Sequence, residues 1–177
     1  MRALVPLVLA AAVAAVAAPL DARQGEIVFT SRQMGVPVDG RFRRFEGEAS
    51  LDLQRPEGAR VAVSVDLASV EIGTAEIEAE LARPEWFATQ AHPRATFRST
   101  AVKALGGGRF EVTGALTLKG RTREVVVPVA LASAGGVVTA AGAFIIQRSA
   151  FGIGQGEWSD TALVADDVRV RFTLRLP

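Results

Sequence analysis

The sequence contains no cysteine and no tyrosine, a single histidine (His92), and only two lysines among its 20 basic residues. Without cysteine the chain has no disulfide, no thiol nucleophile, no cysteine-ligated zinc and no lipid anchor built on a cysteine. One histidine cannot supply a metal site made of several histidines. We therefore expect no metal and no cofactor. His92 is interpreted as an exposed loop residue before a strand, because no catalytic partner accompanies it.

Other catalytic signals are equally weak. Ser133, Ser149 and Ser159 all lack the G-x-S-x-G turn that exposes an activated hydroxyl. The stretch G-I-G-Q-G at 152–156 lacks the Lys-Ser/Thr ending of a phosphate-binding loop. Three aspartates within 160–167 do not have the spacing of a calcium loop and are interpreted as a solvated turn. The sequence therefore predicts a protein that is not an enzyme.

The N-terminus has the pattern of an export signal. Arg2 supplies a positive start, the run 3–18 carries no charge, and small residues precede Pro19. The alternative, an uncleaved membrane anchor, needs roughly 20 strongly apolar residues, whereas this run is short, rich in alanine and interrupted by Pro6. We expect residues 1–18 to be a signal peptide and 19–177 a single domain in the periplasm or secreted, with no stable membrane insertion after cleavage.

The charge of that domain is balanced. Without Arg2, 19 basic residues face 19 acidic ones, so the expected net charge is zero. Nucleic-acid partners require a basic surface. We therefore expect no nucleic acid as a partner.

Hydrophobic residues alternate with polar ones through most of the chain, which is the period of a strand with one buried face. The clearest example is the C-terminus, where Val168, Val170 and Phe172 alternate with arginines and a threonine. The alternation predicts eight strands, at 26–32, 45–53, 61–67, 94–102, 110–118, 123–131, 137–147 and 168–176. Turn signals separate them at 55–58, 106–108, 119–121 and 134–136.

One segment breaks this rhythm. Residues 74–83 place Ile77 and Leu81 four apart, carry acids in the first turns and end at Pro84, which predicts a short helix. Strands at this spacing indicate a sandwich or an up-and-down barrel. A helix between two strands, followed by Trp86 and Phe87, could cap one end of a barrel.

The residues alone leave the nature of the interior open. Gly114 and several other small residues share the parity of the apolar side chains that point inward: Gly47, Ala49, Ala95 and Ser99. In a hollow barrel they would leave room for a ligand. In a solid core they would relieve crowding or allow the strands to coil.

Four segments resemble the YceI-like polyisoprenoid-binding proteins, in the same order and spacing. They are M-G-V-P-V-D-G-R-F-R-R-F-E-G (34–47), W-F-A-T-Q-A-H-P-R-A-T-F-R-S-T (86–100), V-T-G-A-L-T-L-K-G-R-T-R-E-V (112–125) and Q-R-S-A-F-G-I-G (147–154). The resemblance covers about 27–176. It implies an extended lipocalin-like antiparallel barrel, usually exported, whose apolar tunnel holds a long isoprenoid chain. With the strands and helix predicted above, the expected fold is an all-β, eight-stranded antiparallel lipocalin-like barrel with a short helix between two strands.

The resemblance and the alternation together define the expected site. Residues of inward parity should line the tunnel: Phe29, Phe45, Phe97, Phe110, Gly114, Leu116, Phe144 and Phe172. Residues near the predicted barrel ends should form its mouth: Phe42, Trp86, Phe87 and Phe151. Gly114 is expected to be small because the ligand passes there. Arg148 is expected to bind backbone carbonyls rather than a ligand.

The expected partner is a long-chain isoprenoid or a similar apolar lipid, bound and carried or sequestered without catalysis. A structural or partner-binding secreted barrel with a solid core is the alternative, and an enzyme acting on an isoprenoid lipid is a weaker one. A homodimer is compatible with the sequence. The chain departs from the family at two places, with Gln33 where the family often has His and E-A-E-L (78–81) where it often has D-x-H-L. If those positions contact a headgroup, its chemistry differs here.

Overall fold

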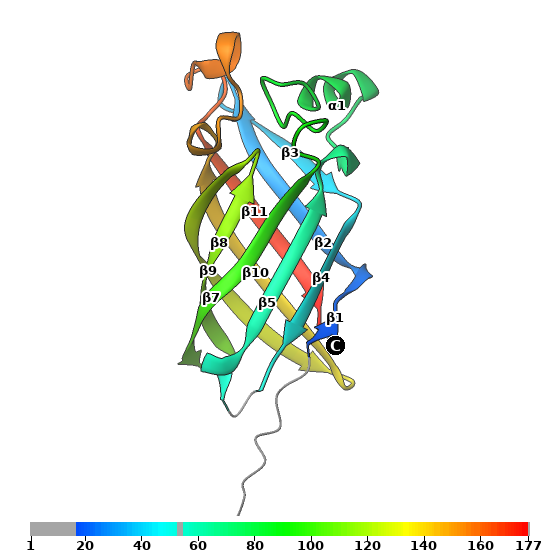
Figure 1. Ribbon diagram of the computed structural model, residues 1–177, viewed down its shortest axis with the longest axis vertical. Helices are drawn as coiled ribbons and strands as arrows, with labels where there is room; N and C mark the ends of the chain where they lie inside the picture. Colours follow the sequence, from blue (N-terminus) through cyan, green and yellow to red (C-terminus); the bar gives the residue numbers. More distant parts are fainter. Residues whose placement is uncertain (1–16, 53–54, 177) are drawn as a thin grey trace, which may run out of the picture.

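The computed structural model describes residues 17–52 and 55–176, and the predicted signal peptide therefore lies almost entirely outside it. One antiparallel sheet curls into a tall barrel, with the helix and the longer loops gathered at the end opposite the C-terminus (Figure 1). The strands are β1 (Ala18–Pro19), β2 (Asp21–Gln33), β3 (Val36–Phe42), β4 (Phe45–Ser50), β5 (Arg60–Asp66), β6 (Val70–Glu71), β7 (Arg94–Gly106), β8 (Arg109–Leu118), β9 (Arg121–Ala134), β10 (Val137–Gln147) and β11 (Asp167–Arg175). The all-β barrel class is confirmed.

The strand count is eleven, so the predicted count of eight is wrong. The three additional strands, β1, β3 and β6, each join a predicted strand across a bend. The bends fall at Leu20, at 43–44 and at the 3-10 turn Leu67–Ser69. β1 and β6 have only two residues each, and Pro37 and Gly40 hide the alternation of β3. Proline and glycine are poor strand formers, which is why sequence periodicity missed β3.

The bends also bring the two edges of the sheet together. The strand order is β1-β4-β5-β7-β8-β9-β10-β11-β2-β3-β6. β1 pairs with β4, yet the chain continues from it directly into β2, which pairs with β11. At the junction the amide of Leu20 donates to the carbonyl of Gly47 over 2.8 Å. The chain therefore crosses from one edge of the sheet to the other, as closure of a barrel requires.

The tight hairpin turns follow the sequence signals. Lys119 and Gly120 have φ angles of 49° and 71° between β8 and β9. Gly135 and Gly136 have φ angles of 58° and 79° between β9 and β10. Two successive positive φ values match the type I′ turn, whose twist suits antiparallel strands. Gly107 and Gly108 also have positive φ angles, 62° and 73°, between β7 and β8. The signal at 55–58 is a short 3-10 helix, Pro56–Gly58.

The predicted helix is present as α1 (Ala75–Leu81). Thr74 is its N-cap, and the hydroxyl of Thr74 accepts from the amide of Ile77 over 3.4 Å. Leu81 is buried beneath the helix, whereas Ile77 is 47% exposed. α1 and the loops after it lie over one end of the barrel (Figure 1), which we call the α1 end. No helix in the described residues is long and apolar enough to cross a membrane.

Two groups of buried side chains stabilise the barrel. The first lies at the α1 end and includes Leu67, Phe87, Phe151 and Ile153. The second lies nearer the C-terminus and includes Leu20, Ile27, Phe45, Ala49 and Leu174.

Candidate functional site: an apolar cavity along the barrel axis

A cavity of about 620 Å³ occupies the barrel interior. It extends from Ile77 and Glu80 at the α1 end to Leu131 and Leu176 near the C-terminus. Its wall is almost entirely apolar, because inward residues of each strand are Val, Leu, Ile, Phe or Ala. The volume lies within the roughly 300–1,000 Å³ typical of small-molecule sites. The interior is therefore hollow, whereas the sequence alone had allowed either a hollow barrel or a solid core.

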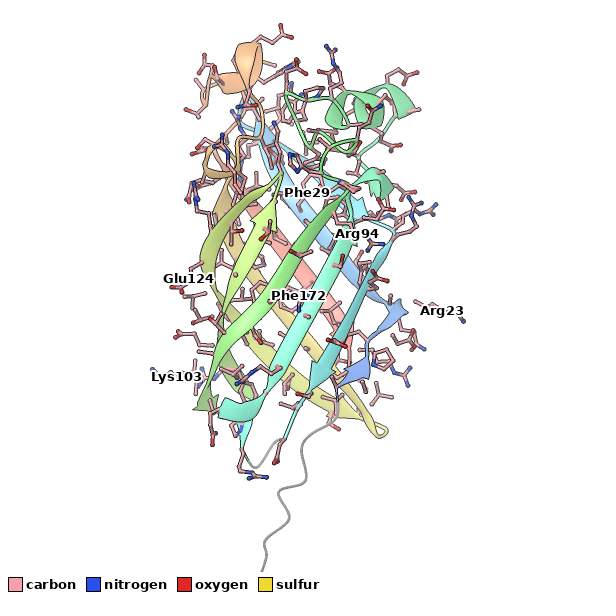
Figure 2. The ribbon with its side chains drawn as sticks, viewed as in Figure 1. Arg23, Phe29, Arg94, Lys103, Glu124 and Phe172 are labelled. Atoms are coloured by element: carbon pink, nitrogen blue, oxygen red, sulfur yellow. The ribbon has the colours of Figure 1, made fainter. Side chains whose placement is uncertain are left out.

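The structure brings most of the predicted site residues to this cavity. Figure 2 shows Phe29 and Phe172 within the barrel, whereas Lys103 and Glu124 lie on its outside. The predicted residues that line the cavity are Phe29, Phe42, Trp86, Phe87, Phe97, Phe110, Leu116, Phe144 and Phe172. Phe29, Phe42 and Phe87 form an aromatic cluster at the α1 end, with ring centroids 5.5 and 6.1 Å apart. Their contact with a lipid stays a prediction.

Three predicted site residues do not line the cavity. Phe45 points inward but is 8% exposed and packed in the second core group, over the backbone of Gly25. Phe151, expected at the mouth, is 2% exposed inside the first core group. Gly114 is covered by the ring of Phe97, so no ligand passes over it.

The relation between Gly114 and Phe97 recurs around the barrel. A Cβ at Gly114 would overlap the Phe97 ring and would lie 2.6 Å from the carbonyl oxygen of Arg98. Gly40 and Gly142 face Phe29 and Phe172 in the strand registers, and a Cβ on either glycine would overlap that ring. Each phenylalanine thus lies along the wall over a neighbouring glycine. Large apolar side chains can therefore shield the backbone and still leave the lumen open.

Arg148 organises the loops at the α1 end. Its side chain is buried, and its five N–H groups donate to five backbone carbonyls. The acceptors are Ile153 and Gly154 at 2.9 Å from Nη1, Trp158 and Val164 at 2.9 and 2.7 Å from Nη2, and Ala165 at 3.2 Å from Nε. Burial lowers the pKa of Arg148, and Asp166 partly offsets this. No donor is left for a ligand, so the structural role expected from the sequence is confirmed.

Lys119 ties two of these loops together. Its Nζ donates to the carbonyl of Pro84 over 2.5 Å, to that of Gly152 over 2.6 Å and to Oε1 of Gln155 over 3.0 Å. Burial is the main cause of a lowered pKa for Lys119, followed by the charge of Arg121. The positive φ of Lys119 in the β8–β9 turn aims its side chain at the loops. The piece L-T-L-K-G thus fixes the loop that carries Trp86.

Trp86 and Trp158 close the cavity at this end. Both line it, and their ring centroids are 5.6 Å apart. The indole Nε1 of Trp86 is buried and has no hydrogen-bond partner among the described residues. An unsatisfied buried donor is costly. A ligand oxygen at this place would satisfy it.

The two departures from the family pattern meet at the same end. Gln33 and Glu80 both line the cavity, from the end of β2 and from α1. Glu80 pairs with Arg83 at 3.0 Å. Glu76 is a further lining residue, and hydrogen bonds from its own amide and from Thr74 lower its pKa, so it is ionised at neutral pH. The α1 end of the cavity therefore carries carboxylates, and the departures concern the place where a polar head would lie.

The weak catalytic candidates have structural roles. His92 lies in the loop before β7, as expected, but it is partly buried, with its ring over Gly120, rather than exposed. Asp166 accepts from the amide and the hydroxyl of Ser149 over 2.9 and 2.8 Å. Asp160 accepts from the amide of Ala162 over 2.8 Å. Within residues 17–52 and 55–176, no three His, Cys, Asp or Glu side chains are placed to hold a metal ion.

The fold and the cavity define the class: an antiparallel β-barrel with an apolar interior cavity and a short helix over one end. The YceI-like domain matches this chain over residues 19–176. The chain belongs to the YceI-like family, as the resemblance of its motifs indicated.

Several solved structures share the fold. The crystal structure of BcnA from Burkholderia cenocepacia superposes with a TM-score of 0.87 at 36% identity, covering 89% of this chain and 99% of that one. A polyisoprenoid binding domain from Saccharophagus degradans superposes with a TM-score of 0.70 at 18% identity, covering 89% and 95%. At that identity the second likeness shows the fold alone.

The curated relatives are bacterial proteins described only as UPF0312. The protein from Azotobacter vinelandii is 40% identical over 88 residues, which are 50% of this chain and 46% of that protein. The Vibrio cholerae proteins are 35% identical over 98 residues, 55% of this chain and 52% of theirs. The matched part thus spans about half the length of these relatives.

Proposed function

We propose that this protein binds one long-chain isoprenoid-type lipid along the barrel axis and carries or sequesters it without changing it chemically. The observation that carries the proposal is the apolar cavity of about 620 Å³, which runs from the α1 end to the C-terminal end. The polyisoprenoid binding domain of Saccharophagus degradans, which shares the fold, supports the choice of ligand.

The energetics favour a chain-like apolar ligand. Each CH₂ group moved from water into an apolar site contributes about 0.8 kcal/mol. Lining residues such as Val63, Val127 and Ala140 offer no hydrogen bonds, so they recognise length and thickness rather than functional groups. The polar lining side chains lie towards the ends of the cavity, among them Gln33, Glu76 and Trp86 at the α1 end, and the pair Ser50 and Arg60 at the opposite end.

The direct test is analysis of lipid retained by the folded protein. We expect organic extracts of protein purified from a bacterial host to contain an isoprenoid, detectable by mass spectrometry, in a ratio near one per chain. Unchanged mass of that lipid after long incubation would support a binding role over an enzymatic one. Folded protein that carries none and takes up no added isoprenoid would overturn the proposal and favour a barrel that serves a protein partner.

Ala140→Phe tests whether the cavity itself holds the lipid. Ala140 is 7% exposed and lines the cavity from β10, so a ring there occupies the lumen. We expect the variant to fold with a free energy of unfolding within about 1.5 kcal/mol of the parent, because it fills empty space, and to retain little lipid. The matched control is Ala130→Phe, since Ala130 is exposed on the outer face of β9. Full lipid retention by Ala140→Phe would place the ligand elsewhere.

We also propose that the protein is exported and cleaved near Ala18. The charge-free run 3–18 supports this proposal. Intact-mass measurement on a periplasmic fraction should give a chain that starts at Ala18 or Pro19. A full-length chain in the membrane pellet would mean an uncleaved anchor instead.

A further inference from the structure

The barrel wall has one lengthwise split, between β9 and β10. Their ladder runs from the pair Val137–Ala134 to the pair Gly142–Val129 and ends there. Beyond it, β10 continues to Gln147 paired only with β11, and β9 extends back to Arg121 paired only with β8. Within the part of the chain that the structure describes, no strand occupies the space between them.

Pro128 explains where the split begins. The carbonyl oxygen of Pro128 lies so close to Gly142 that a Cβ there would overlap it, so this peptide edge of Pro128 faces β10. In an extended strand, the N–H and C=O of one residue point to the same side. Proline lacks the N–H, so the donor is missing on the edge that faces β10. The ladder stops at the adjacent residue, Val129.

The split is visible on the outer surface as a groove of about 700 Å³. Phe144 and Ile146 line both this groove and the interior cavity, so one layer of residues separates the two spaces. Val126 of β9 and Ile145 of β10 lie on the two edges of the groove, which we call its lips, and are 50% and 56% exposed. These two residues would face each other if the ladder continued. Charged and polar residues, Arg123, Glu124, Gln147 and Arg169, also line the groove, but Val126, Ile145, Phe144 and Ile146 form an apolar path from its surface toward the apolar cavity.

Phe151 fills the end of the split nearest the loops. It belongs to the 3-10 turn Arg148–Phe151 between β10 and the long loop, and it borders the groove. It is only 2% exposed, which explains why it is absent from the cavity wall and from the mouth. Its turn is held by the Arg148 network, whereas Val126 and Ile145 are each held by a strand ladder on one side only, to β8 and to β11.

We propose that the split between β9 and β10 is the lateral opening through which the isoprenoid chain passes into the cavity. The inference rests on the proposed function. The α1 end is covered by the helix and loops (Figure 1), and a long chain threaded there end-on would have to pass Glu76 and Glu80. A chain that enters sideways, between Val126 and Ile145, moves from one apolar surface to another and crosses only the layer of Phe144 and Ile146.

The absence of cysteine allows single sites to be blocked. Ile145→Cys and Val126→Cys would be coupled to a polyethylene glycol maleimide. Uptake of a fluorescent geranylgeraniol from phosphatidylcholine vesicles would then be followed in time. We expect coupling at either lip to slow uptake roughly tenfold, or about 1.4 kcal/mol in activation free energy, and to leave the final load unchanged. The matched control is Ala130→Cys, which lies on the outer face of β9 where the ladder to β10 is intact.

A second site distinguishes the route. Ile77→Cys carries the same polymer at the exposed rim of the α1 end. Slow uptake with coupled Ile77→Cys and normal uptake with both coupled lips would overturn the lateral route in favour of end-on passage. Normal uptake in all coupled variants would also overturn it. Failure of the unmodified parent to take up the probe would instead contradict the proposed function. The proposal of a lateral opening would then be wrong as well, because it rests on that function.

Discussion

The α1 end and the body of the barrel are held together by different forces. At the α1 end, two cations, Arg148 and Lys119, donate to backbone carbonyls of loops that have no ladder of their own. In the body, long ladders such as β8–β9 and β2–β3 satisfy the backbone, and the inward side chains are almost all apolar. Loops need specific donors because their buried carbonyls lack strand partners. Because the wall of the body is held by backbone hydrogen bonds between strands, its interior can contain a cavity.

This difference predicts how the two regions respond to substitution. A wall stabilised by its own backbone tolerates changes in inward apolar side chains, as long as the new atoms do not overlap the backbone or rings of neighbouring strands. A capped end stabilised by single cations does not tolerate their loss, because several carbonyls become unsatisfied together. Stability should therefore depend on the α1 end, and ligand capacity on the body.

Arg148→Met should have the largest effect on stability. It removes the donor of five backbone carbonyls, three in buried and two in partly buried hydrogen bonds, and replaces the guanidinium by a side chain that cannot bind them. Breaking a buried polar network of this kind costs about 3–5 kcal/mol in the free energy of unfolding. Chemical denaturation would measure it. Arg171→Met is the matched control, since Arg171 is exposed on β11 and should change stability by less than about 0.5 kcal/mol. Equal effects would refute the contrast between the regions.

Lys119→Met should cost about 2 kcal/mol, because it removes a donor shared by Pro84, Gly152 and Gln155. The change keeps a long unbranched side chain at the same positive φ. Thermal unfolding at neutral pH would measure the loss, with Lys103→Met at an exposed position of β7 as the control. Proteolysis within 84–92 should accelerate in Lys119→Met alone. An unchanged cleavage rate would show that Lys119 does not fix this loop.

Gly114→Ala marks the limit of tolerance in the body. A Cβ would lie 2.6 Å from the carbonyl oxygen of Arg98 and would overlap the Phe97 ring, so the strands must shift. We expect a loss of about 1–2 kcal/mol, the range of overpacking. Gly58→Ala is the control, because nothing lies within 4 Å of a Cβ at Gly58 and its φ is negative. An unchanged free energy of unfolding for Gly114→Ala would mean that Phe97 and the backbone shift at no cost. Gly114 could then be exposed to the cavity, as the sequence predicted.

The sequence predicted the features that depend on local pattern. Alternation located eight of the strands, and Thr74 and Pro84 bounded the helix, because side-chain parity and capping are properties of neighbouring residues. Inward parity also placed Phe97, Phe110 and Phe172 at the cavity. These predictions needed no knowledge of which strands pair.

Features that depend on pairing were not predictable. Gly114 has inward parity, but a glycine is needed there because the Phe97 ring of the adjacent strand lies over it. Only the β7–β8 register reveals this contact. Phe151 follows the strand as a mouth residue would, yet its turn folds it into the core. The split at Pro128 had a visible signal, a proline inside a predicted strand, since proline is rare in a central strand.

The smallest effect on stability is expected at Trp86. This variant tests whether the α1 end binds the polar group of a ligand whose chain lies in the body of the barrel. Trp86→Phe removes the buried Nε1 that has no partner among the described residues. Losing an unsatisfied donor is favourable, whereas losing part of the contact with Trp158 is not, so the free energy of unfolding should change by less than about 1 kcal/mol. With an isoprenoid alcohol bound, Nε1 can donate to the ligand oxygen, and Trp86→Phe should weaken binding about fivefold, as for one hydrogen bond of about 1 kcal/mol. The hydrocarbon analogue without the hydroxyl should bind parent and variant equally. Equal loss for both ligands would mean that Trp86 contributes only apolar contact, and that the α1 end closes the cavity without recognising a polar head.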